Sequence, residues 1–199
     1  LNRLNDRYKT EFPDGAPLVC ACEKGRFEDV KLFITCMHGS NNNMTLKEYV
    51  NQEGKDSDGD DGWTPLMAAA RYEHFQMAKY LVEIIYPHAS KVEKKYYAEF
   101  PDGTPIVCAC QHGRFEDVKL LITGRNDVNG SNGNNNNNMT LKEYVNQVGE
   151  DSDGDDRTPL IAAAENEHFQ IVKYLIEQCE ADPNIANSYG QNALHLAAH

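Results

Sequence analysis

Apolar residues recur along this chain at the spacing of one helix face. Phe27, Val30 and Ile34 stand at i, i+3 and i+7, with charged residues between them. The same spacing returns in three later segments: 75–82, 115–122 and 169–176. Each segment predicts an amphipathic helix with a single buried stripe. Because such a helix cannot bury its stripe alone, we expect it to pack against a neighbouring helix.

A short phrase precedes each of these helices and predicts a second helix. It reads Thr-Pro-Leu-x-x-Ala, or close to it, and begins at five places: Ala16, Thr64, Thr104, Thr158 and Asn192. A threonine or asparagine there accepts a hydrogen bond from the first free amides, whereas Ala16 cannot. Proline suits the first helical position. Gly25 and Gly113 come where the helix must end and the chain reverse.

The phrase resembles the first helix of an ankyrin repeat, and the chain is similar to that family over nearly its whole length. The resemblance implies an all-α fold: a solenoid of stacked antiparallel helix pairs with β-turn or hairpin fingers. From Thr158 to Asn192 is 34 positions, close to the roughly 33 of a standard repeat. The earlier spacings are 48, 40 and 54, so we expect inserted loops after the second helices.

The chain also contains a longer sequence duplication, which spans more than one repeat. Residues 11–35 match residues 99–123 at 20 of 25 positions. We expect one domain over 1–199, with an N-terminal cap helix at 1–12, repeats at 13–50, 51–98 (with a linker helix), 99–145 and 146–186, and the start of a fifth at 187–199. Capping boxes predict short extra helices at 45–49 and 140–144. The missing initial Met and the interrupted fifth repeat suggest a piece of a longer array.

Charge narrows the classes of partner. The net charge of −12 argues against nonspecific binding of nucleic acid or anionic membranes, both of which need a basic surface. It favours a basic partner protein, or else serves only to keep the array soluble. No apolar run is long enough to cross a membrane, and no signal peptide is present, so we expect an intracellular, cytoplasmic protein. The sequence does not indicate an oligomeric state.

Residues that could carry chemistry do not form a recognisable site. Cys20, Cys22, Cys108 and Cys110 stand where the resemblance implies small buried side chains, so we expect reduced thiols. No nucleophile–histidine pattern, phosphate loop or metal-ligand cluster is discernible, so we expect no enzymatic activity, cofactor or metal. The resemblance gives structural roles to three histidines: His74 and His168 would bond to neighbouring loops, and His195 would bond across repeats.

An acidic loop at 56–61 returns at 151–156 and has the composition of a calcium loop. The spacing does not fit an EF-hand, because Gly59 would stand at position 4 and Met67 at position 12. We therefore expect solvated, charged turns at the finger tips, with weak calcium binding as the alternative. The asparagine-rich segment at 126–138 predicts a mobile loop.

The resemblance implies an interaction scaffold whose concave face, made by finger tips and first helices, binds a partner protein. Gly62 is expected as the turn glycine of the second finger, with Asp156 in its place in the fourth, and Glu23 and Lys24 as exposed first-helix positions. The candidate partner-binding residues are Asp60, Asp61, Trp63, Arg71, Tyr72, Gln111, His112, Asp155, Arg157, Glu165, Asn166, Ser188, Tyr189 and Gln191. The alternative is a targeting or regulatory arm of a larger enzyme or channel.

Overall fold

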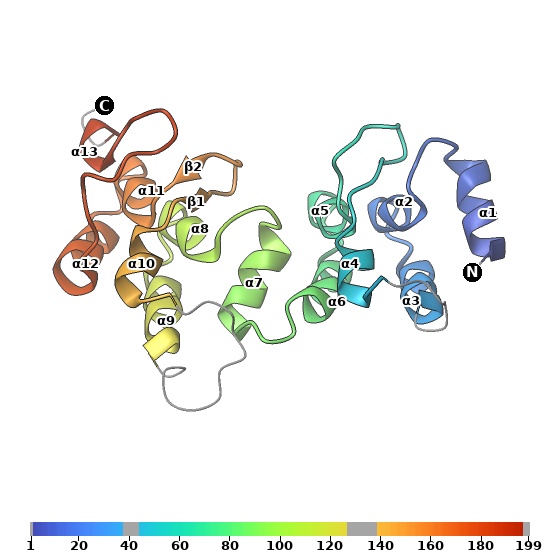
Figure 1. The fold of residues 1–199 in the computed structure, drawn as a ribbon, viewed down its shortest axis with the longest axis horizontal. Helices are drawn as coiled ribbons and strands as arrows, with labels where there is room; N and C mark the ends of the chain where they lie inside the picture. The colour runs from blue at the N-terminus through green and yellow to red at the C-terminus, as the bar shows by residue number, and fades with distance from the viewer. Residues whose placement is uncertain (1, 38–43, 127–138, 197–199) are drawn as a thin grey trace. The chain divides into compact units, whose positions relative to one another are not determined.

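The computed structural model describes residues 2–37, 44–126 and 139–196, which fall into two compact units, here called unit 1 (Leu1–Ala89) and unit 2 (Ser90–His199) (Figure 1). Helices dominate both. Unit 1 contains α1 (Asn2–Glu11), α2 (Pro17–Glu23), α3 (Phe27–Met37), α4 (Leu46–Val50), α5 (Pro65–Arg71) and α6 (Phe75–Ile85). Unit 2 contains α7 (Lys91–Glu99), α8 (Pro105–Gln111), α9 (Phe115–Asn126), α10 (Leu141–Asn146), β1 (Gly149–Glu150), β2 (Asp156–Arg157), α11 (Pro159–Glu165), α12 (Phe169–Cys179) and α13 (Ala193–Leu196).

Unit 1 is built from two helix pairs, α2–α3 and α5–α6, with α2 packed beside α5 (Figure 1). The apolar stripe of α3 is buried as the sequence predicts, since Val30, Phe33 and Ile34 have almost no exposed surface. Phe27 reaches the next pair, where its ring meets the edge of Tyr80 at 5.4 Å between centroids. Neighbouring pairs therefore share one core instead of closing separate ones.

Unit 2 repeats this arrangement with α8–α9 and α11–α12, and α8 packs beside α11. Phe115 meets Tyr174 at 5.4 Å, which reproduces the Phe27–Tyr80 contact. The finger that leads into α11 forms a two-stranded antiparallel ladder, with Gly149 opposite Arg157 and Glu150 opposite Asp156. The asparagine-rich segment lies almost entirely in 127–138, outside the described residues.

A cap helix lies at the start of each unit, and both predicted helices are confirmed. Tyr8 of α1 and Tyr96 of α7 are fully buried. Their hydroxyls donate to Asp29 at 2.7 Å and to Asp117 at 2.9 Å. These contacts fasten each cap helix to the second helix of the first pair. The short helices predicted from capping boxes also form, as α4 and α10.

The prediction about helix caps is confirmed at four phrases, including Asn192, whose Oδ1 accepts from His195 N at 3.1 Å, and is wrong at one. Thr64 and Thr158 each accept a backbone N–H at 3.1 Å, and Ala16 makes no cap bond. Thr104 makes none either. Its ψ is 120°, against 155° at Thr64, and its own N–H donates to Glu150 O at 2.8 Å. Its side chain packs against Gly149 of the finger instead.

Candidate functional site

The finger tips are tight turns closed by a buried acidic or amide side chain. Asp56 is only 6% exposed, and its Oδ1 accepts the N–H groups of Asp58 (3.0 Å) and Asp60 (2.9 Å). Asp151 holds its own finger in the same way. The prediction of a fully solvated turn is therefore wrong for the first residue of each acidic loop. Its carboxylate satisfies the backbone of the turn, an Asx turn, and points inward.

The same hydrogen-bond pattern recurs with a glycine in each finger, and Gly62, the expected turn glycine of the second finger, also has a positive φ of 89°. Asn187 repeats the pattern in the fifth finger, where its Oδ1 accepts from Tyr189 (3.1 Å) and Gln191 (2.9 Å). The glycine three residues after each Asx residue has a positive φ that favours glycine: Gly59 (93°), Gly154 (83°) and Gly190 (75°). The expectation that Asp156 replaces a turn glycine is wrong, because Asp156 lies in β2.

A second contact ties each of the two acidic fingers to the preceding first helix. The carboxylate of Glu23 accepts hydrogen bonds from Ser57 N (2.8 Å) and Ser57 Oγ (2.6 Å). Gln111 accepts the same two bonds from Ser152, at 2.9 and 2.7 Å. We call this contact the clasp, defined by Glu23–Ser57 in unit 1 and Gln111–Ser152 in unit 2. Glu23 is 5% exposed, so its expected exposure is wrong.

Histidines bind the same first helices at the residues that form the clasp. His74 Nε2 lies 3.0 Å from Glu23 O, and His168 Nε2 lies 2.9 Å from Gln111 O. They were predicted to bond to neighbouring loops, and they bond instead to the last residue of the preceding first helix. Gly25 lies against the ring of His74, and a side chain at that residue would meet the ring. The contact that the structure shows for His195 is local: its Nδ1 lies 2.6 Å from Asn192 Oδ1, in its own helix start.

Several candidate binding residues lie at the junctions as well. The side chain of Arg157 is 13% exposed and donates to Glu165 at 2.6 Å. Gln111 donates to Asp153 at 2.9 Å in addition to its clasp. Trp63 is half-buried. These side chains stabilise fingers, which limits the surface that each one leaves for a partner.

Other candidates are exposed. In unit 1 these are Asp60, Asp61, Arg71 and Tyr72, and the guanidinium of Arg71 lies 5.7 Å from the centre of the Trp63 ring. In unit 2 the exposed candidates are His112, Glu165, Asn166, Ser188 and Tyr189, whereas Asp155 and Gln191 are half-buried. The ring of His112 stacks on Phe100 at 4.8 Å. Each unit therefore presents its own exposed set, from its fingers and the ends of its first helices.

The thiols are built into the core. Cys20, Cys22, Cys108, Cys110 and Cys179 are buried and unpaired by disulfides, which confirms the predicted small buried side chains in both first helices. Burial raises the pKa of the Cys20 thiol to about 11 and that of Cys108 to about 12. Because the thiolate is the reactive form, these cysteines are poor nucleophiles and poor metal ligands at neutral pH. Within residues 2–37, 44–126 and 139–196, no three acidic, His or Cys side chains gather where they could hold a metal ion.

Sequence reasoning missed the clasp. Its only signal was the serine that follows Asp56 and Asp151 in both acidic loops, paired with a Glu or Gln that ends the preceding first helix. Ser57 and Glu23 are 34 positions apart in the sequence, so nothing in the sequence indicates their contact before the fold brings them together.

Stacked helix pairs, joined by fingers that are bonded to the preceding helix, define a helical repeat protein. The chain matches the family model described as "Ankyrin repeats (3 copies)" over residues 18–132 and again over 131–199. It therefore belongs to the ankyrin repeat family, and its fold is the all-α ankyrin solenoid. Ankyrin repeats are in general protein–protein interaction modules and are typically not catalytic. Of the helices that the structure describes, none has the length and apolar character needed to cross a membrane.

Proposed function

We propose that this chain is a protein interaction scaffold that binds a partner protein on the side formed by its fingers and first helices. The observation that carries the proposal is Tyr189, which is 71% exposed although its turn is held by the Asn187 side chain. A large aromatic side chain on a rigid turn loses little conformational entropy on binding, so it suits an interface anchor. In unit 1, Tyr72 (44% exposed) ends a first helix and offers a similar anchor.

Charge supports a basic partner. Asp60 and Asp61 are exposed on the second finger, and the whole chain carries a net charge of −12. Charges at the rim of an interface act mainly on the association rate, because they steer the partner before contact. We therefore assign the aromatic residues to affinity and the aspartates to the rate of association.

A reducing intracellular compartment suits this scaffold. Five of its thiols are buried in first or second helices and form no disulfide. Oxidation would have to open the core to reach them, so the fold is compatible with a cytoplasm that keeps thiols reduced.

Substitution of the two tyrosines tests the proposal. A partner captured with the full chain should bind roughly 30-fold more weakly to Tyr189→Ala or Tyr72→Ala if each is an anchor worth about 2 kcal/mol. Asp60→Asn should change mainly the association rate and its salt dependence. Surface plasmon resonance on folded variants measures both quantities.

The matched control is Phe169→Ala. Phe169 is 70% exposed, much like Tyr189, but it begins the second helix α12. The partner should bind this variant as it binds the parent protein. If instead Phe169→Ala weakens binding and neither tyrosine variant does, the partner docks on the second-helix side and the proposal is wrong.

A further inference from the structure

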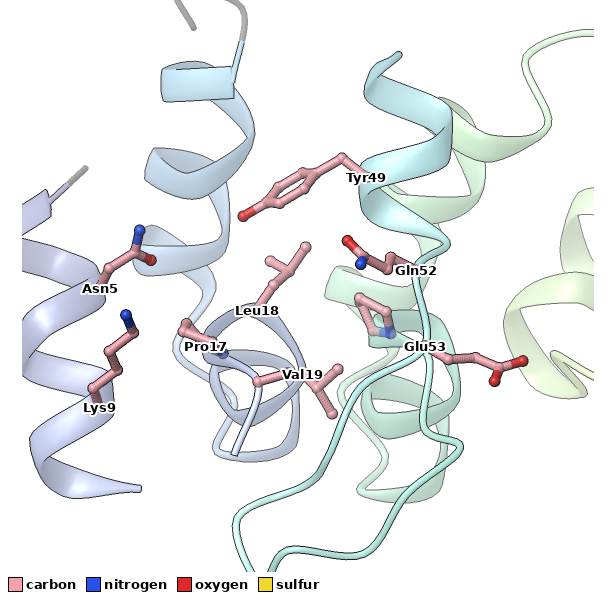
Figure 2. A pocket seen from close by; sticks show the side chains of 10 residues that line it. Asn5, Lys9, Pro17, Leu18, Val19, Tyr49, Gln52 and Glu53 are labelled. Carbon is pink, nitrogen blue, oxygen red and sulfur yellow. The ribbon is translucent and has the colours of Figure 1, made fainter. Parts of the chain in front are cut away.

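A cleft in unit 1 lies between the cap helix α1, the start of α2 and the end of α4, with a volume of about 310 Å³ (Figure 2). Its floor is apolar and consists of Pro17, Leu18 and Val19. Asn5 and Lys9 stand on α1 at one side, and Tyr49 extends from α4 with its hydroxyl directed toward that side. Figure 2 shows Glu53 pointing outward, away from the floor.

Three polar groups beside the floor can donate hydrogen bonds, those of Lys9, Asn5 and Tyr49, whereas Gln52 can also accept and Glu53 brings a carboxylate. Within the described residues, neither the Lys9 ammonium, nor the Asn5 amide, nor the Tyr49 hydroxyl forms a hydrogen bond or ion pair. Burial raises the pKa of Tyr49 to about 12, so its hydroxyl keeps the proton and remains a donor at neutral pH. The cleft thus combines the exposed Lys9 ammonium with two neutral groups that can donate and an apolar floor, while the Glu53 carboxylate lies at its outer edge and points away.

The duplicated unit shows that the fold does not require this cleft. In unit 2, Tyr97 stands in the place of Lys9 and Thr104 in the place of Ala16. Thr104 packs against Gly149. Around it Pro105 and Tyr144 are buried, whereas their counterparts Pro17 and Tyr49 in unit 1 are half-exposed. The same architecture therefore exists with these two side chains buried, and unit 2 also carries Glu93 in the place of Asn5 and Val148 in the place of Glu53.

We propose that the cleft binds the C-terminal residue of a partner protein, with the terminal carboxylate at Lys9 and the apolar side chain on the floor. This proposal rests on the proposed function, since the occupant belongs to a protein partner. Lys9, Asn5 and Tyr49 supply donors for a single carboxylate, which matches one negative charge. The volume is near the lower end of small-ligand pockets, which run from about 300 to 1,000 Å³, so it suits one or two residues.

A chain terminus fits better than an internal acidic residue. The last residue of a polypeptide carries its carboxylate and its side chain on one Cα, so both reach a small cleft together. An internal Asp or Glu presents a carboxylate at the end of a polar side chain. Its apolar neighbour is at least one residue away, about 3.3 Å along an extended chain, and the backbone must also leave the cleft.

Short peptides test the site in the full chain. The probes are Gly-Ser-Gly-Ser-X peptides with an acetylated N-terminus, a free C-terminal carboxylate and Leu, Ile, Val or Phe as X. In ¹⁵N NMR titrations, at least one should give saturable shifts at the Leu18 and Val19 amides. The same peptide with a C-terminal amide should bind about tenfold more weakly or worse, because the charged acceptor is lost. A peptide with an internal aspartate and an amidated C-terminus tests whether the cleft binds an acidic side chain instead.

Two variants take advantage of the duplication. Lys9→Gln removes the charge and should weaken binding about fivefold or more. The double variant Lys9→Tyr, Ala16→Thr introduces the residues of unit 2 and should abolish binding, while circular dichroism and the unfolding midpoint show a folded chain. Introducing these residues is compatible with the fold, because unit 2 already carries them.

Three results would overturn the proposal. They are equal binding of the amidated peptide, undiminished binding by the folded double variant, or no saturable binding of any free-acid peptide up to about 5 mM. Tighter binding of the internal-aspartate peptide would assign the cleft to acidic side chains instead. A scaffold that still loses its partner on Tyr189→Ala keeps the proposed function in every one of these cases, so the two proposals fail separately.

Discussion

At the scale of single residues, the clasp shows how one position joins neighbouring repeats. Glu23 and Gln111 occupy equivalent places and accept the same two hydrogen bonds from a finger serine. One is a carboxylate and the other an amide. Desolvation by burial would raise the pKa of Glu23, but hydrogen bonds from Lys24 and Ser57 outweigh it, so the pKa lies below its ordinary value of 4.5.

This difference predicts that the clasp itself contributes a pH dependence in unit 1 and none in unit 2. A carboxyl group whose pKa is lowered by folding stabilises the protein above its unfolded pKa, and that stability is lost as pH falls through the folded pKa. Thermal unfolding midpoints of the parent chain should therefore drop below about pH 4.5 by more than those of Glu23→Gln, which copies the amide of unit 2. Equal pH profiles for the two proteins would show that the Glu23 charge contributes nothing to the clasp. Gln111→Glu, the reverse change, should introduce the dependence into unit 2.

At the scale of elements, equivalent helix starts use their first residue in different ways. Thr158 caps α11 and is buried, whereas Thr104 at the start of α8 makes no cap bond and packs on the finger. Ala16 holds the equivalent place in unit 1, and its N–H donates to Lys55 O at 2.8 Å as that of Thr104 donates to Glu150. At these two helices the finger thus binds the N–H of the residue before the helix, and no side chain caps the first helical turn.

Alanine substitution should separate these two roles. Thr158→Ala should lower the free energy of unfolding by about 1 kcal/mol or more, since it removes a cap at a buried site. Thr104→Ala should cost clearly less, because it removes no cap and places at residue 104 the alanine that unit 1 carries at residue 16. Urea denaturation measures both, and the two helices lie in the same unit, so the reference state is shared. A larger loss at Thr104 would mean that its packing on Gly149 outweighs a helix cap.

At the scale of the whole molecule, the duplication has produced two units that each begin with their own cap helix. The apolar core of unit 2 is continuous from Tyr96 to Ala193 and contains only residues of that unit. Tyr96 of α7 is fully buried in it, and Arg114 pairs with Glu99 at the end of the same helix. The helix that the sequence presents as a linker is therefore part of the core of the second unit.

Unit 2 should accordingly fold by itself. A fragment of residues 90–199 should give a helical circular dichroism spectrum and a cooperative thermal transition, because repeat arrays are stable when their terminal faces are covered. A shorter fragment that begins at residue 103 and lacks α7 should be markedly less stable. If the longer fragment is unfolded, or if the two have the same stability, α7 does not serve as a cap.

Much of the fold could be predicted because its signals are local. The i, i+3, i+7 stripes, the prolines at helix starts and the capping boxes at Thr45 and Thr140 all act within a few residues. The cap helices followed from the match between the two halves of the chain. The candidate site was predicted less well: Glu23 is buried, Gln111 and Arg157 hold fingers, and the fourth finger turns at Gly154 and not at Asp156.

The sequence by itself determined the repeat, the helix pairs and the family. The reason is that hydrophobic period, helix propensity and helix capping all depend on residues close together in the sequence. Only the tertiary structure decided which polar side chains face solvent. Glu23 lies 34 positions from Ser57, and Asp56 looks like any other aspartate of its loop until the turn closes around it. The open cleft at Lys9 and its counterpart at Tyr97 likewise depend on packing between α1, α2 and α4, since burial is a property of contacts between distant segments.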